Sequence, residues 1–212
     1  MQVDVWSDIA CPWCYVGKRR LEAAIAAYEG ADPVNVTWHS FELDPSAPAA
    51  YDTDAAAHLA LKYGRTQEQA AAMLEQLTEL ASGDGLDLRF DLSRGGNTFD
   101  GHRVVQLALR HGKQGEMKER LMRAYFTDGE LVSDHATLHR LALEVGLPAT
   151  EVDELLAGDE LAEDVRTDEY TAAQLGIDAV PFFVVDRRYA AKGAQPAEYL
   201  AEVLQRAAAD AA

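Results

Sequence analysis

The sequence has no long hydrophobic run and no basic stretch near its start. A membrane-spanning helix needs about 20 consecutive apolar residues, and no segment of the chain approaches that length. Residues 2–6 read Gln-Val-Asp-Val-Trp, which supplies neither the basic region nor the apolar core of an export signal. We therefore expect a cytoplasmic protein that neither crosses nor binds a membrane.

Basic residues are also scarce. The chain has 19 Lys and Arg residues against 36 Asp and Glu residues, which gives a formal net charge of −17. Such a charge repels phosphate backbones, so nucleic acid is not an expected partner. The content of 48% hydrophobic and 26% charged residues is typical of a globular protein. A length of 212 residues suffices for one domain, or for one domain that carries a large insertion.

Cysteine occurs at only two positions, Cys11 and Cys14, which form a single C-x-x-C pair. A structural zinc site usually takes about four Cys or His ligands, and the chain offers no second C-x-x-C and no closely spaced Cys/His pair. We therefore expect no bound metal. Because a reducing cytosol disfavours a lasting structural disulfide, we predict redox cycling of the pair. A pair of inert thiols is the alternative.

The cysteine pair stands between two predicted strands. Residues 3–7 alternate as a short strand does, a helix is predicted to begin near Cys11 with Pro12 at its first position, and residues 34–41 alternate again. This order favours a parallel βαβ unit. The free N–H groups and the positive dipole end of a helix stabilise a thiolate. We therefore predict that Cys11 attacks a disulfide and that Cys14, one turn further in and less exposed, resolves the product.

The middle of the chain predicts helices, and its end predicts a second β-unit. Residues 55–176 show apolar residues at helical spacing almost throughout. Residues 182–185 form a continuous apolar run, typical of a buried strand, and Pro181 must lie at its start because proline cannot donate to a central strand ladder. Residues 189–193 predict a returning edge strand, and Pro196 opens a last amphipathic helix.

A polar loop at residues 97–103 leads into one of the predicted helices. Two interpretations stay open. In the first, Asn97 or Thr98 caps that helix and His102 is exposed. In the second, these side chains form a polar wall of the redox cleft. His39, in the second predicted strand, is interpreted as a packed or hydrogen-bonded residue and not as a catalytic one.

The order of the elements resembles the thioredoxin fold, and the long helical interval resembles its DsbA-like members. Four blocks in chain order resemble the FrnE-type cytosolic DsbA-like oxidoreductases, namely residues 11–18, 97–98 with 102–103, 176–184 and 193–196. The resemblance implies an α/β fold with a mixed sheet. In it, residues 1–45 and 177–212 form a discontinuous thioredoxin-like domain, and residues 46–176 form an all-helical insertion domain.

The resemblance also implies which residues meet a substrate. Cys11 and Cys14 are then catalytic, and the peptide bond between Val180 and Pro181 is cis and faces them, so that the main chain of Val180 can pair with an extended substrate. The residues assigned to substrate binding are Pro12, Trp13, Val180, Pro181, Asn97, Thr98 and His102. Trp13 stands where the DsbA pattern has histidine, which argues against a strongly oxidising role.

Two related families leave a second activity open. Kappa-class glutathione transferases and hydroxychromene-carboxylate isomerases are similar but carry serine at the position of Cys11. They imply a cleft shaped for glutathione, which would then act as a co-substrate, with no other cofactor expected.

The residues admit three hypotheses on function. The first is a cytosolic thiol-disulfide oxidoreductase or isomerase whose substrate is a disulfide-containing protein or a small thiol. The second is a glutathione-dependent isomerase or transferase that acts on an aromatic or quinonoid small molecule. The third is a non-enzymatic binding module or chaperone in which the dithiol is incidental. Each is compatible with a monomer or a homodimer.

Overall fold

The computed structural model describes residues 1–30 and 33–210. Its sheet consists of the strands β1 Gln2–Ser7, β2 Asn35–Ser40, β3 Phe182–Val185 and β4 Tyr189–Lys192. Their order across the sheet is β2-β1-β3-β4. β1 runs parallel to β2 and antiparallel to β3, which in turn runs antiparallel to β4. The predicted parallel βαβ unit, the returning edge strand and the mixed sheet are confirmed.

Nine helices accompany this sheet in the described residues. They are α1 Pro12–Ala26, α2 Ala55–Tyr63, α3 Gln67–Gly83, α4 Phe99–Arg110, α5 Gln114–Phe126, α6 His135–Val145, α7 Ala149–Ala157, α8 Ala162–Gln174 and α9 Ala197–Ala209. The predicted helical interval is therefore present as α2 to α8. Across the same residues, no helix is both long enough and apolar enough to cross a bilayer.

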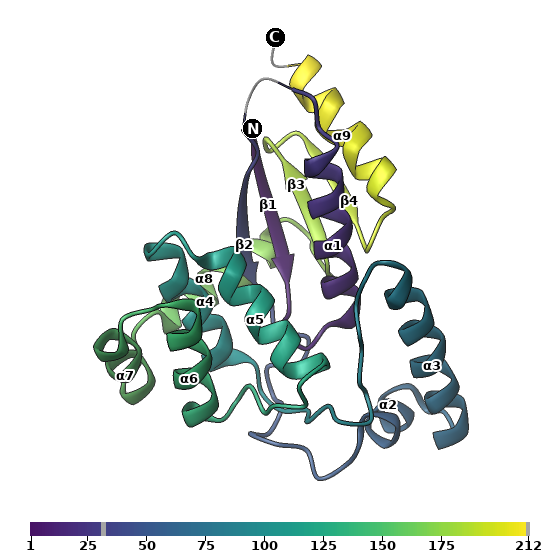
Figure 1. Cartoon of the computed structure of the whole chain (residues 1–212), viewed down its shortest axis with the longest axis vertical. Helices are drawn as coiled ribbons and strands as arrows, with labels where there is room; N and C mark the ends of the chain where they lie inside the picture. The colour runs from purple at the N-terminus through teal and green to yellow at the C-terminus, as the bar shows by residue number, and fades with distance from the viewer. Residues whose placement is uncertain (31–32, 211–212) are drawn as a thin grey trace.

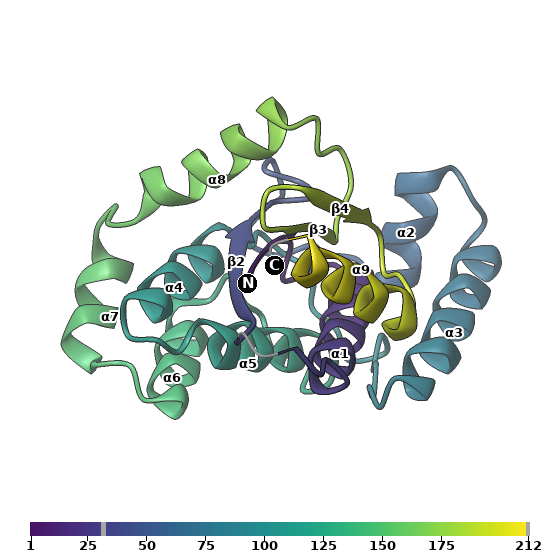
Figure 2. The same cartoon turned by 90° about the horizontal axis from the view of Figure 1, so that it is seen from above.

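The helices occupy three places around the sheet. Helices α1 and α9 lie side by side against one face (Figure 1). The helices between β2 and β3 form two groups at the end of the sheet where β1 finishes, with the α2–α3 hairpin on one side and α4 to α8 on the other (Figure 2). The start of α1 consequently lies where both groups approach the sheet.

The apolar core has three parts. One fills the space between the sheet and the helices α1 and α9, and a second lies within α4 to α7. The third contains both cysteines together with Trp6 of β1, Ala81 of α3 and Met122 of α5. Because this third cluster draws residues from the sheet and from both helical groups, the cysteines sit at their junction. The division of the chain into two domains at residues 45 and 177 stays a prediction.

A polar network fastens the helical block to the sheet at β2. Asp168 of α8 accepts hydrogen bonds from Nδ1 of His39 at 2.6 Å, from the Ser40 N–H at 2.8 Å and from Nε2 of Gln106 at 2.6 Å. The ring of His39 stacks on Trp6 with centroids 4.4 Å apart, and its Nε2 lies 3.0 Å from a carboxylate oxygen of Asp4. His39 is thus packed and hydrogen-bonded, as the sequence predicts.

We expect this network to weaken as the pH rises. Burial opposes protonation of His39, but the hydrogen bonds and charges of Asp168 and Asp4 outweigh burial and raise its pKa. A raised pKa contributes stability that is complete below the unfolded value of about 6.5 and is lost as the pH rises through the folded value. Urea unfolding of wild type and His39→Gln between about pH 5 and 9 should therefore show a stability advantage of wild type that shrinks with pH. An advantage that grows with pH contradicts this assignment.

Candidate active site

Cys11 occupies the cap position that precedes α1. Its backbone is extended, with φ −96° and ψ 110°, and its Sγ accepts a hydrogen bond from the Cys14 N–H at 3.3 Å. Pro12 is the first residue of the helix, as predicted. A sulfur that accepts a helix N-terminal N–H also faces the positive end of the helix dipole, and both interactions favour the thiolate. The local geometry therefore suits Cys11 to be the nucleophile.

Cys14 is the less accessible of the two sulfurs. Its exposed fraction is 0% against 3% for Cys11, so the predicted order of exposure holds, although both residues are buried. Both are free thiols. Burial, and then the hydrogen bond and charge of Cys11, raise the pKa of Cys14 well above its usual value, while Lys118 opposes the shift. Cys14 is therefore held as a thiol.

The loop before β3 contacts both Cys11 and α1. The peptide bond between Val180 and Pro181 is cis. The Cys11 thiol lies 3.7 Å from the Val180 carbonyl oxygen, to which it can donate. Pro181 packs so closely on α1 that a Cβ added to Gly17 would lie 2.8 Å from its Cγ. The sequence pattern around Gly17 thus permits the close contact that sets the Val180 carbonyl beside the nucleophile.

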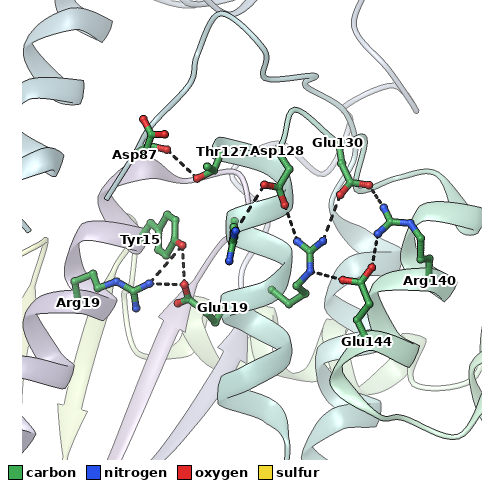
Figure 3. Close-up of polar contacts among 11 residues, drawn as sticks. Tyr15, Arg19, Asp87, Glu119, Thr127, Asp128, Glu130, Arg140 and Glu144 are labelled. Atoms are coloured by element: carbon green, nitrogen blue, oxygen red, sulfur yellow. Dashed lines mark hydrogen bonds and ion pairs between the residues drawn. The ribbon is translucent and has the colours of Figure 1, made fainter. Parts of the chain in front are cut away.

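A charged cluster holds the first turns of α1 against α5. Glu119 of α5 accepts a hydrogen bond from the Tyr15 hydroxyl at 2.7 Å and also pairs with Arg19 (Figure 3). It accepts a further hydrogen bond from the Lys18 ammonium at 2.7 Å. Burial opposes ionisation of Glu119, but the interactions with Arg19 and Lys18 outweigh burial and lower its pKa to about 2. Glu119 therefore stays ionised and fixes the helix that carries the cysteines.

A second buried cluster lies behind the dithiol. Asp8 accepts a hydrogen bond from the Leu43 N–H at 2.8 Å, and its carboxylate lies 3.1 Å from Nε2 of His102. Burial raises the pKa of Asp8, but His102, the Leu43 N–H and Lys118 together lower it below its usual value. Burial and Lys118 lower the pKa of His102. A neutral His102 can donate its Nε2–H to an ionised Asp8, whereas its buried Nδ1 has no hydrogen-bond partner among the described residues.

Lys118 is the functional candidate that sequence reasoning missed. Its side chain is fully buried, its ammonium donates to the Ser7 carbonyl at 2.9 Å, and burial lowers its pKa to about 8. Its favourable electrostatic partners include Cys14 and Asp8. The signal was present, because Lys118 falls on the buried stripe of α5 beside Leu121 and Met122. A lysine on the apolar face of a helix marks a buried charge that needs a partner.

The structure supports part of each interpretation of the polar segment at residues 97–103. Thr98 is buried and lines a cavity beside Cys11. Asn97 accepts the Phe99 N–H at 2.8 Å and donates toward Glu42, so it organises the loop that enters α4. His102 has an exposed fraction of 0%, and the expectation of an exposed histidine is wrong. Residues 101–108 of α4 are buried, and His102 contacts Asp8 from inside the core, where a substrate cannot touch it.

The other predicted site residues lie together. The cavity beside Cys11 has a volume of about 320 Å³, and Asp8, Pro12 and Trp13 contribute to its lining. Trp13 is 44% exposed. Val180 and Pro181 do not belong to this lining, and the Val180 carbonyl contacts the Cys11 sulfur. In residues 1–30 and 33–210, no group of three or more His, Cys, Asp or Glu side chains is arranged to hold a metal ion.

Comparison with known proteins agrees with this architecture. The family model described as a DSBA-like thioredoxin domain matches residues 2–205. A probable DsbA oxidoreductase from Streptomyces coelicolor superposes with a TM-score of 0.92 at 44% identity, covering 98% of this chain and 89% of that one.

Two more distant structures share the fold. A 2-hydroxychromene-2-carboxylate isomerase gives a TM-score of 0.71 at 13% identity, with 97% of this chain and 95% of that chain covered. The cytosolic disulfide reductase DsbM from Pseudomonas aeruginosa gives 0.64 at 18% identity, with 97% and 98% covered. Since the family model spans nearly the whole chain and the Streptomyces structure is similar in both sequence and fold, the protein belongs to the family of DSBA-like thioredoxin domains.

Proposed function

We propose that this protein is a cytosolic thiol-disulfide oxidoreductase or isomerase in which Cys11 attacks a substrate disulfide and Cys14 resolves the mixed disulfide. The observation that carries the proposal is the asymmetry of the two sulfurs. Cys11 caps α1 and accepts the Cys14 N–H, whereas Cys14 is fully buried and has a raised pKa. One sulfur is thus suited to attack first, and the other to act only after the first has formed a bond.

The same asymmetry suggests the direction of the reaction. When Cys11 enters a mixed disulfide, its negative charge no longer opposes ionisation of Cys14, and Lys118 then favours the Cys14 thiolate. In a reducing compartment the resting enzyme is a dithiol, so we propose that it reduces or isomerises disulfides. DsbM, which shares the fold, is described as a cytosolic disulfide reductase, and that description is compatible with this direction.

The proposal is tested by trapping. Cys14→Ser removes the resolving sulfur and should accumulate mixed disulfides through Cys11, which non-reducing gels and mass spectrometry detect in cell extract. Cys11→Ser serves as the matched control, since the buried Cys14 should capture nothing. Capture by Cys11→Ser without capture by Cys14→Ser reverses the two roles.

A second candidate function is favoured by the cavity beside Cys11. A glutathione-dependent isomerase or transferase needs room for an aromatic substrate next to its nucleophile, and the cavity of about 320 Å³ provides it. The fold itself is compatible with this activity, because a 2-hydroxychromene-2-carboxylate isomerase shares it. If the Cys11→Ser variant has isomerase activity, this candidate is supported, because the similar families carry serine at the position of Cys11.

A further inference from the structure

The cavity beside Cys11 is closed by elements far apart in the chain. Its lining is made by Asp8 and residues 10–13, the β2–α2 connection, the α2–α3 hairpin, the α3–α4 connection and the end of α5. Its volume of about 320 Å³ lies at the lower end of the range for small-molecule sites. Cys11 itself belongs to the lining, so a molecule in the cavity lies beside this residue.

The lining of this cavity is mainly apolar and rich in rings. Its half-buried apolar members include Tyr51, Leu59, Leu74, Leu77, Phe90 and Tyr125. Three further lining side chains, Trp13, Tyr63 and Met73, are 44%, 57% and 43% exposed. Exposed apolar groups gathered around one cavity, on a chain with a net charge of −17, mark a place for an apolar ligand.

The carboxylates in the lining already accept hydrogen bonds from other groups of the protein. Asp8 is engaged by the Leu43 N–H and by His102. Asp44 accepts hydrogen bonds from Ser46 and Tyr51. A third, Asp54, caps α2, so the acidic groups are committed to the protein itself.

Cationic partners in the lining are limited to His58 and Lys62. Burial, and then the charge of Lys62, lower the pKa of His58, which favours its neutral form. A ligand with several charges, such as glutathione, would therefore lose hydration here with few groups to replace it. The cavity instead suits an uncharged ring.

We propose that the cavity binds the apolar half of a low-molecular-weight disulfide that carries an aromatic ring, with the sulfur of that half next to Cys11. This inference rests on the proposed disulfide exchange and names its substrate class. The Val180 carbonyl and the cavity contact Cys11 separately, so a ring in the cavity leaves the cis-proline side free for the other half of the substrate.

The exchange balances without any further reactant. The Cys11 thiolate attacks the ring-bearing sulfur, the Cys11–sulfur bond forms, and the other half departs as a thiolate. Cys14 then loses its proton and attacks Cys11, which releases the ring-bearing half as a thiolate that is protonated. The dithiol is oxidised by two electrons to the Cys11–Cys14 disulfide, and the substrate is reduced to two thiols.

The reduction experiment compares two uncharged disulfides that differ by one ring, benzyl 2-hydroxyethyl disulfide and bis(2-hydroxyethyl) disulfide. Both are offered to the reduced, full-length protein, and kcat/KM is measured for wild type, Met73→Asp and Leu80→Asp. Met73 lines the cavity, whereas Leu80 lies on the same helix outside the lining. The exposed fractions of the two side chains are similar, 43% for Met73 and 39% for Leu80. We expect wild type and Leu80→Asp to prefer the ring by about tenfold or more, from the apolar area that the ring buries. Met73→Asp should lose most of that preference.

A binding experiment separates this inference from the proposed function. Benzyl 2-hydroxyethyl sulfide has the same ring but no bond that a thiol can cleave, and its binding should protect Cys11 of wild type from alkylation by iodoacetamide. If the sulfide protects Cys11 and neither disulfide is reduced, binding of the ring in the cavity is supported and the proposed disulfide exchange is contradicted. If both disulfides are reduced equally and the sulfide gives no protection, the proposed disulfide exchange is supported and the binding of an aromatic ring in the cavity is overturned. Equal protection in wild type and Met73→Asp also overturns the assignment of the ring to this cavity.

Discussion

Cys11→Ser is expected to lower the rate of disulfide reduction by about a thousandfold or more, since a serine hydroxyl hardly ionises near neutral pH and cannot form the covalent intermediate. The fold should survive the change. The serine oxygen can accept the Cys14 N–H that Cys11 Sγ now accepts, and serine is a favoured residue at a helix N-cap. The loss should therefore appear in turnover and not in the free energy of unfolding.

The measurement is the reduction of insulin or of bis(2-hydroxyethyl) disulfide, with urea unfolding of the same samples as the check on folding. Cys14→Ser is the informative companion, because it should still perform the first attack and stall before release. Full turnover by Cys11→Ser contradicts the role of Cys11 in disulfide exchange. If such a variant instead retained a glutathione-dependent isomerase activity, the second candidate function would replace the first.

Local patterns in the sequence were enough to place the nucleophile. The alternation before Cys11, the proline that follows it and the helical spacing beyond are each encoded within about one turn or one strand, so they predict β1 and the start of α1. The position of Pro181 before an apolar run similarly predicts β3. The four blocks that resemble the DsbA-like oxidoreductases then predict the fold, because the resemblance depends only on their sequences and on their order along the chain.

The surroundings of the dithiol could not be predicted in the same way. His102 meets Asp8 across 94 positions of the sequence, and Lys118 meets Ser7 across 111. These contacts depend on how α4 and α5 pack on the β1–α1 connection, which no local pattern encodes. For the same reason, the sequence left open whether His102 is exposed or belongs to a polar wall of the cleft. His102 is buried within α4, and the carboxylate that it contacts comes from another element.

The second large effect is expected from Lys118→Met, which should reduce the free energy of unfolding by about 3 kcal/mol. The methionine matches the volume of the buried lysine stem, so the loss does not come from a cavity. It comes from the Asp8 carboxylate, which stays buried without the nearby cation, and from the Ser7 carbonyl, which loses its donor. Catalysis should change as well. With less support for the Cys14 thiolate, the mixed disulfide at Cys11 should persist about tenfold longer in single-turnover experiments.

A double-mutant cycle with Asp8→Asn decides whether the two buried charges act as a pair. Removing one partner leaves an uncompensated buried charge, whereas removing both leaves none. Asp8→Asn combined with Lys118→Met should therefore cost less than the sum of the single variants, by about 1–3 kcal/mol. Lys192→Met removes an exposed lysine and should leave both stability and the lifetime of the mixed disulfide unchanged. Additive effects of Asp8→Asn and Lys118→Met would mean that Lys118 acts on the sulfurs without Asp8, and an unchanged lifetime in Lys118→Met would leave the lysine a purely structural role.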